Sequence, residues 1–464
     1  MSKYLIAGLL MITEQLALII LFITPGLFIS SFFNMKTEFL LTSSFAIFFW
    51  GFSSFLIPMN FFINSSYFKW LIYLMFVIWI FKFKNIKNPL FNILLILLFE
   101  LINNSFGVLH IVSTSQITFD SALSNLSYQS GVLGVSSIQI ALLKFFNESY
   151  ILLTLQQCLA ISLMVFNIKS LITQNNLKAV TTLTIIPAFF IFSVLLEIMT
   201  IRTHFFASQL LCFLIIESFK PKYNRFSRGV FFLFLSLFIS SRLENLIIYF
   251  PLIFLLLRAY FYNENLQNDI NQSSMLFVTL LSPLIANYYG YSYSQDLRAN
   301  LILLSFLVFL LTSLTIFKDN LFVEFVYRHF IIFFIASLVF LSGCLYYLFS
   351  FKAINSWLFI INHLLDTHRG WVTAVCYFIV ILIYLISRTN NVKLKRVYTT
   401  FFLTFVLIIV SSPLHHSIYG GELWSSGIVE GLAIYNPFDE SQTRSFLQLF
   451  LALIPFSVLI SSRT

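Results

Sequence analysis

Long apolar runs, separated by short polar segments, make up most of this chain. A membrane-crossing helix needs about 20 predominantly apolar residues, and runs of that order recur from one end of the sequence to the other. The pattern predicts an all-α fold, a polytopic transmembrane helical bundle of about 13–15 membrane segments. We expect spans at 15–34, 38–62, 66–82, 88–108, 149–168, 179–199, 205–219, 273–290, 299–317, 329–350, 371–387, 397–412 and 446–461.

One further apolar run, 229–257, carries Arg242 and Glu244 near its middle. If the run crossed the membrane once, both ionisable groups would sit near the bilayer centre, where each costs roughly 2.5–3.5 kcal/mol. A hairpin with arms 229–241 and 245–257 avoids this, because it places the pair at the apex. The two alternatives put everything downstream on opposite sides of the membrane.

The distribution of Lys and Arg decides between them, because basic residues are retained in cytoplasmic loops. Downstream of the apex, a single crossing would leave most basic residues outside. The hairpin leaves Arg298, Lys352, Arg369 and Arg444 outside, and it places inside Arg258, Lys318, Arg328, Arg388, Lys393, Lys395, Arg396 and Arg463. The hairpin is therefore preferred. Arms of 13 residues reach only about 20 Å, so we expect the apex to lie below the outer surface and to line a polar cavity.

Composition supports a membrane protein and narrows its class. The 464 residues are 59% hydrophobic and 10% charged, with a mean hydropathy of +0.92, which excludes a water-soluble globular protein. We expect a multi-pass protein of the plasma (inner) membrane. The net charge of +9 is explained by the topology, and no soluble basic domain is present to bind nucleic acid. The pattern GxxxxGK[ST] is absent, which disfavours an ATP-driven pump.

The longer polar segments, 109–148, 351–370 and 413–445, all fall on the outer face in this topology, so function is sought there. They contain most of the histidines and several carboxylates. The features of segment 117–171 follow one another in a recognisable order. They are Asp120, an amphipathic stretch, a Gly- and Ser-rich turn, the apolar stretch 137–146, and then the next span. Because 137–146 is too short to cross a bilayer and contains Lys144, it predicts an interfacial helix in the outer loop.

This order resembles the first outer loop of the C-type glycosyltransferase superfold. These are polyprenyl-phosphate-sugar-dependent membrane glycosyltransferases, which include relatives of the protein mannosyltransferases and aminoarabinose transferases. "GVSSIQIALLKFFNES" is similar to the family's interfacial helix, and "SLFISSRLENLIIYFPLIFLLL" to a family segment in which Arg242 and Glu244 match an Arg and a Glu. "VLLEIMTIRTHFFASQLLCFLIIE" resembles a span with a lumen-facing acid. The likeness covers about 105–260, and the chain has one acid at Asp120 where many members have two.

The resemblance implies three parts: N-terminal helices (1–104), a glycosyltransferase-like core (105–260) and C-terminal helices (261–464). Glycosyl transfer needs a base for the acceptor proton and cations for the departing phosphate. Asp120 is the candidate base, although it could instead cap the following helix. Glu197 could orient the acceptor or Asp120, or could pair with Arg202. Arg242 is the candidate donor-phosphate ligand, and Glu244 could line the same cavity or fix the apex as part of an ion pair.

Two further outer segments, "INHLLDTHRGW" and "PLHHSIYGGELW", concentrate histidines. His368 and Arg369 are candidate ligands of the donor phosphate. Imidazole and carboxylate groups also suit a divalent cation, but the spacing matches no closed site, so no metal ligand is assigned and the cofactor is left unknown.

The predicted function is an integral membrane glycosyltransferase that moves a sugar from a polyprenyl-phosphate donor to a glycan, lipid or protein acceptor on the outer face. Its other expected partner is membrane lipid, with no nucleic acid. A polysaccharide polymerase or ligase, or a flippase for lipid-linked oligosaccharides, is the alternative, although no Arg-x10-Gly pattern of the polymerases occurs. A secondary transporter is a third possibility, but we find no internal repeat that would suggest one.

Overall fold

The structure is a computed structural model of the whole chain. It describes residues 16–17, 19–29, 31, 46, 66–83, 94, 151–178, 183–191, 203–219, 225–241, 244–263, 307, 310, 321–365, 370–419 and 437–463. Within these ranges every regular element is a helix, which confirms the predicted all-α class. The interfacial helix expected at 137–146 lies outside them.

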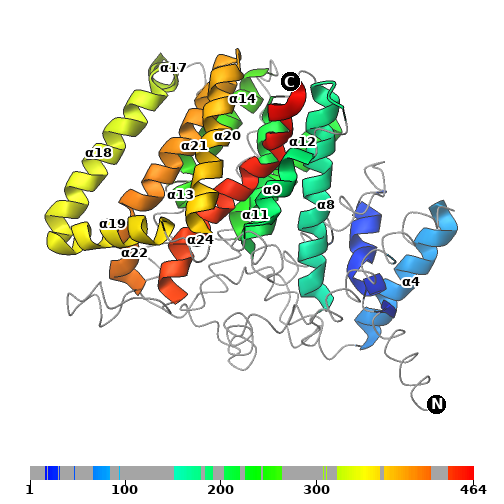
Figure 1. The fold of residues 1–464 in the computed structure, drawn as a ribbon. Helices are drawn as coiled ribbons and strands as arrows, with labels where there is room; N and C mark the ends of the chain where they lie inside the picture. The colour runs from blue at the N-terminus through cyan, green and yellow to red at the C-terminus, as the bar shows by residue number, and fades with distance from the viewer. Residues whose placement is uncertain are drawn as a thin grey trace.

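The helices follow one another as shown in Figure 1. Three stretches are long and apolar enough to cross a membrane, Phe330–Phe349, Trp371–Arg388 and Val392–Leu414, which supports a membrane-associated fold. The elements are α4 (Ser66–Phe83), α8 (Ile151–Gln174), α9 (Ile186–Phe189), α11 (Thr203–Ser218), α12 (Arg225–Ser241), α13 (Glu244–Ile248), α14 (Phe250–Asn263), α17 (Leu321–Arg328), α18 (Phe330–Phe349), α19 (Phe351–Leu364), α20 (Trp371–Arg388), α21 (Val392–Val410), α22 (Ser412–Tyr419), α24 (Pro437–Leu453) and the 3₁₀ helix η4 (Ile454–Arg463).

The run 229–257 folds back on itself as a hairpin, as the positive charges predict. The ring of Phe231, near the start of α12, stacks on the ring of Tyr260, near the end of α14, with centroids 4.1 Å apart. Phe238 and Tyr249, which lie closer to the turn, contact edge to face at 5.6 Å. Residues that approach the turn from both sides therefore pair in antiparallel order.

The two arms are longer than the apolar run suggests, because helix α12 begins at Arg225 and α14 continues to Asn263. The returning arm is also interrupted at Tyr249, between α13 and α14. Pro251 follows that break, and proline lacks the N–H that would bond to the carbonyl of residue 247. Proline in the first turn of a helix is well tolerated, so α14 restarts there and its hydrogen bonds resume with Ile253 N to Tyr249 O.

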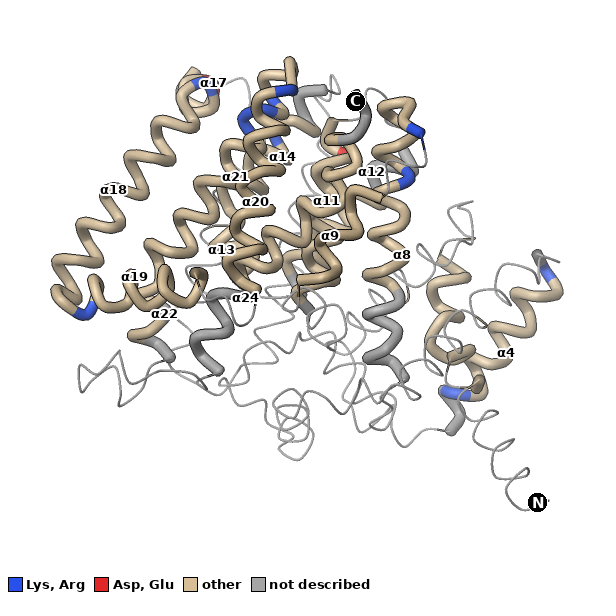
Figure 2. Tube along the Cα trace, viewed as in Figure 1, with Lys and Arg blue, Asp and Glu red and all other residues tan. Residues whose placement is uncertain are grey.

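Most of the basic residues drawn in the bundle lie at one end, and one further basic position, Lys352, lies at the start of α19 (Figure 2). We call the end with most of them the basic end, defined by Arg258, Arg328 and Arg396. Arg258 of α14 pairs with Glu324 of α17 at 3.0 Å, and Arg396 of α21 donates to the carbonyl oxygen of Tyr327. The end of α14, the end of α17 and the start of α21 therefore meet there.

The opposite end, which we call the histidine end, is defined by His363 and His416. Helix α19 lies across this end between α18 and α20, with α22 beside it (Figure 1). Segment 351–370 was expected to be an outer loop, and the structure shows that most of it is α19 instead. The other expected loop, 413–445, contains most of α22 and the start of α24.

Buried polar side chains join the central helices. Asn167 of α8 donates to the carbonyl oxygen of Gln209 at 3.0 Å, and Gln209 of α11 donates to that of Leu451 in α24 at 3.1 Å. Both side chains are fully buried. Because hydrogen bonds between apolar helices are directional, these contacts fix the register of α8, α11 and α24.

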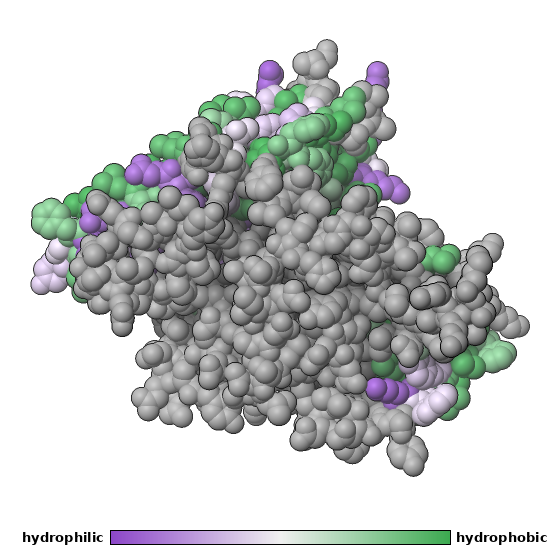
Figure 3. All heavy atoms as spheres, turned by 60° about the horizontal axis from the view of Figure 1, so that its bottom comes forward, coloured by the Kyte–Doolittle hydropathy of each residue, from purple (hydrophilic) through white to green (hydrophobic). Residues whose placement is uncertain are grey.

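Where Figure 3 shows described residues, green apolar atoms outnumber purple hydrophilic ones. In α18, Phe334 and Leu338 face the core while Val339, Phe340 and Tyr347 are 66–87% exposed. A helix that is hydrophobic on every side while only one face meets protein is typical of contact with lipid.

Candidate functional site

The candidate site lies at the histidine end, where one turn of α24, Ser445–Gln448, contacts two other segments. Gln448 Nε2 donates to Asn245 Oδ1 in α13 at 2.9 Å. Ser445 accepts, through its carbonyl oxygen, a hydrogen bond of 2.9 Å from the hydroxyl of Tyr249. The ring of Phe446 contacts that of Trp371, the first residue of α20, at 6.5 Å.

Asn245 fixes the turn of the hairpin. Its side chain is 2% exposed, and its Nδ2 donates to the carbonyl oxygen of Phe238 at 2.8 Å. Helix α12 ends at Ser241, so its last carbonyls lack the intrahelical partners that a longer helix would provide. The Asn245 amide supplies one such contact and at the same time accepts from α24. The turn is therefore tied both to its own first arm and to the rest of the bundle.

The predicted site residues stand next to these contacts in the sequence but outside the described residues. Arg242 falls between α12 and α13, and His368 and Arg369 fall between α19 and α20. Glu244 is the first residue of α13, but only its backbone is described. Asp120, Glu197 and Arg202 also lie outside the described ranges, so their roles stay predictions.

The segments that flank Arg242 and those that flank His368 and Arg369 are nevertheless brought together. Asn245 follows Arg242 by three residues and contacts Gln448. His363 and Trp371 bracket His368 and Arg369, with ring centroids 6.0 Å apart, and Trp371 contacts Phe446. The turn Ser445–Gln448 of α24 thus contacts a residue that flanks Arg242 and a residue that flanks His368 and Arg369.

The two histidine-rich segments also meet, through an aromatic layer. Phe359 of α19 stacks on His363 at 6.3 Å and contacts His416 of α22 edge to face at 5.7 Å. The described residues contain no group of three or more His, Cys, Asp and Glu side chains arranged for a metal ion. In the part of the chain that is described, the layer is a packing arrangement between α19, α20 and α22.

Ser356 and His416 form a buried polar contact within this layer. Ser356 Oγ lies within hydrogen-bond distance of His416 Nδ1 and 3.3 Å from Ser412 Oγ. An imidazole beside a hydroxyl can act as a base that activates a nucleophile. All three side chains have no exposed surface, however, so none of them faces solvent in this structure. The contact joins α19 to α22, and Trp357 joins α19 to the end of α21 by donating to the carbonyl oxygen of Val410 at 3.0 Å.

Sequence reasoning did not single out Asn245, Gln448, Ser356 or His204. His204, in the first turn of α11, is 1% exposed although it follows Arg202 and Thr203 at the edge of the apolar run 205–219, so its burial was not expected. Asn245 could have been found as a polar residue in an otherwise apolar arm, since a buried amide needs partners. Ser356 falls in a series with Ala353, Ile360 and Leu364, the spacing of one buried helical face.

Comparisons with protein-family models, with curated proteins and with solved structures return no match for this chain.

Proposed function

We propose that the protein is an integral membrane glycosyltransferase that moves a sugar from a polyprenyl-phosphate donor to an acceptor on the outer face of the plasma membrane. The observation that carries the proposal is the contact of one turn of α24 with both the hairpin turn and the start of α20. Through it, Asn245, which follows Arg242 by three residues, and Trp371, which follows Arg369 by two, are tied to one end of the bundle.

The charges support the outer location of this end. Arg258, Arg328 and Arg396 meet at the opposite end, and the positive-inside rule assigns such an end to the cytoplasm. The histidine end then faces outward. Polyprenyl-phosphate sugars are the donor class expected there, because a soluble nucleotide sugar is supplied on the cytoplasmic side while a lipid-linked sugar is presented within the membrane.

The division of labour follows from the chemistry of the transfer. Arg242, with His368 and Arg369, would bind the donor phosphate, which gains negative charge as the sugar–phosphate bond breaks. Asp120 would accept the proton of the acceptor hydroxyl. Glu197 would orient the acceptor or Asp120, the alternative being an ion pair with Arg202. Glu244 would hold the turn that carries Arg242. The acceptor is a glycan, lipid or protein.

Helix α19 supports an active site at the membrane surface. It crosses the histidine end (Figure 1) and buries one face, Ala353, Ser356, Ile360 and Leu364, while its other face is more exposed. Because its exposed side includes Phe351 and Leu358, this helix can lie in the interfacial region of the membrane, where the phosphate of a lipid-linked sugar would also lie.

The experiment is a reconstitution of the purified chain with labelled polyprenyl-phosphate sugar and an extract of cell-envelope acceptors. Formation of a new glycosidic bond, with release of polyprenyl phosphate, supports the proposal. Movement of an intact lipid-linked oligosaccharide between leaflets without a new bond would assign the flippase class instead, and chain elongation of lipid-linked repeats would assign the polymerase class.

A further inference from the structure

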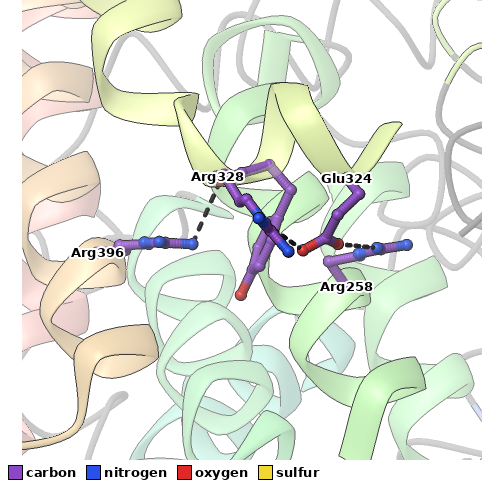
Figure 4. A network of polar contacts seen from close by, with 5 residues as sticks. Arg258, Glu324, Arg328 and Arg396 are labelled. Carbon is purple, nitrogen blue, oxygen red and sulfur yellow. Dashed lines mark hydrogen bonds and ion pairs between the residues drawn. The ribbon is translucent and has the colours of Figure 1, made fainter. Parts of the chain in front are cut away.

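Three arginines gather around a single carboxylate and a single phenol ring at the basic end (Figure 4). We call this group the arginine cluster: Arg258, Arg328 and Arg396, with Glu324 and Tyr327. Glu324 Oε2 accepts from Arg258 at 3.0 Å, and its Oε1 accepts from Arg328 at 3.0 Å. The guanidinium carbons of Arg258 and Arg396 lie 5.4 and 5.0 Å from the centroid of the Tyr327 ring.

The cluster contains more positive than negative charge. Arginine stays protonated in proteins, and the hydrogen bond from Arg328, followed by that from Arg258, lowers the pKa of Glu324, so its carboxylate is ionised. Arg396 makes its hydrogen bond to a neutral acceptor, the carbonyl oxygen of Tyr327, at 3.2 Å. In this described part of the chain, one carboxylate thus pairs with two of the three guanidinium groups, and the third bonds to a neutral acceptor.

The two arginines on the outer side of the cluster are accessible. The side chain of Arg328 is 70% exposed, against 4% for Arg258, and Arg396 is half-buried. Arg328 uses its Nε for Glu324, so the two terminal nitrogens of its guanidinium are not used in that bond. Guanidinium groups bind phosphate oxygens through two parallel N–H donors.

The surface beside the cluster is apolar. Helix α17 exposes Leu321, Phe322 and Phe325 by 52–88%. It leads directly into α18, which is one of the three helices able to cross a membrane. Arg328 is the last residue of α17 and α18 begins at Phe330, so the arginine cluster lies at the end of a membrane helix, where lipid phosphates lie.

We propose that the arginine cluster binds the phosphate of an anionic phospholipid, with Arg328 and Arg396 as its ligands and the acyl chains against the apolar side chains of α17 and α18. A membrane lipid fits better than a free phosphate ion, because the apolar surface adjoins the charges. Arg258 and Glu324 then position the two outer arginines. This inference is independent of the transferase proposal.

The test measures lipid binding to the purified full-length chain in detergent, by native mass spectrometry and by the thermal shift on titration. The probes are phosphatidylglycerol, phosphatidylcholine and sodium phosphate. We expect phosphatidylglycerol to bind at least tenfold more tightly than phosphatidylcholine, and R328Q to weaken phosphatidylglycerol roughly tenfold. The double variant R328Q/R396Q should remove the preference.

The matched control is R388Q, at the end of α20. Arg388 is exposed and its guanidinium carbon lies 5.9 Å from the centroid of the Tyr384 ring, so the same charge is lost outside the cluster. R388Q should bind phosphatidylglycerol as the wild type does.

Because Arg328 is exposed, R328Q should fold even if R396Q loosens α17. Equal effects of R328Q and R388Q would show attraction by net charge alone, and equal stabilisation by sodium phosphate would show a site for free phosphate. Either result overturns the proposal.

Discussion

The Nε2 atom of Gln448 lies 2.9 Å from the Oδ1 atom of Asn245, so α24 is held against the hairpin turn that follows Arg242. Both side chains are at least 98% buried. At this depth an amide contact is difficult to replace, because water is not available to the groups that lose a partner.

Q448M should therefore lower both stability and donor binding. Loss of the hydrogen bond should reduce the free energy of unfolding by about 1 kcal/mol, and a looser turn should weaken binding of the polyprenyl-phosphate sugar. The matched control is Q209M, since Gln209 is an equally buried glutamine that bonds to Leu451. We expect Q209M to lose similar stability and keep donor affinity, measured by titration of the purified protein. Equal loss of affinity in both variants would argue against a special role for the turn.

The basic end should face the cytoplasm. Single cysteines placed at Ser227 and Lys395 in a background with the four native cysteines replaced should be labelled by membrane-impermeant reagents only in inverted vesicles. A cysteine at Asn362, an exposed position of α19, should be labelled in intact cells. Labelling of positions 227 and 395 from opposite sides would contradict the antiparallel pairing of Phe231 with Tyr260.

The spans expected at 329–350, 371–387 and 397–412 correspond to the three described helices long and apolar enough to cross a membrane, and the hairpin was also predictable. The spans expected at 38–62, 88–108, 273–290 and 299–317 lie almost wholly outside the described residues. The length of an apolar run, such as the one that forms α20, directly predicts the length of the helix. The side of the membrane on which each loop lies follows from the positions of lysine and arginine. The match is close for α18, expected at 329–350 and found at Phe330–Phe349.

Helices α19 and α22 were not predicted, because each is short and mixed in composition. Segment 351–370 contains Lys352, Asn362 and three ionisable residues after Leu365, and a hydropathy average over it indicates a loop. Burial of Ser356 depends on a partner, His416, that lies 60 residues further on. Contacts of this kind are set by tertiary packing, which local periodicity does not contain.

S356A should destabilise the protein without lowering the transfer rate of the folded fraction. It removes the buried contacts to His416 and Ser412, which we expect to cost about 1–3 kcal/mol. S337A is the control, because Ser337 is exposed and bonds only to the carbonyl of Phe333 within α18; its change should stay within about 0.5 kcal/mol. Thermal unfolding in detergent measures both. A large fall in turnover per folded S356A molecule would instead assign Ser356 to the active site.

Stability at the basic end should depend on pH through Glu324. Its pKa is lowered from 4.5, first by the hydrogen bond from Arg328 and then by that from Arg258, so the folded state holds its proton less tightly than the unfolded state. The resulting stabilisation is fully present above pH 4.5 and is lost as the pH falls through the lowered pKa.

Because the Glu324 side chain is 35% exposed, we expect the contribution to be no more than about 1 kcal/mol. Thermal unfolding of the wild type and of E324Q, followed from about pH 7 to about pH 3, should show a difference that shrinks in acid. Other carboxylates titrate in both proteins and cancel in the comparison. A difference that stays constant over this range would mean that Glu324 does not stabilise the end of α17 as an anion.

Sugar transfer by the Asp120→Asn variant tests most directly whether the outer face carries a base-catalysed transferase. Asparagine keeps nearly the same shape but cannot accept the proton of the acceptor hydroxyl, so turnover should fall by about 10²–10⁴ while donor binding is kept. The measurement compares Asp120→Asn, wild type and S337A at matched abundance and thermal stability, with labelled polyprenyl-phosphate sugar. Full transfer activity in a well-folded Asp120→Asn protein would contradict the catalytic assignment.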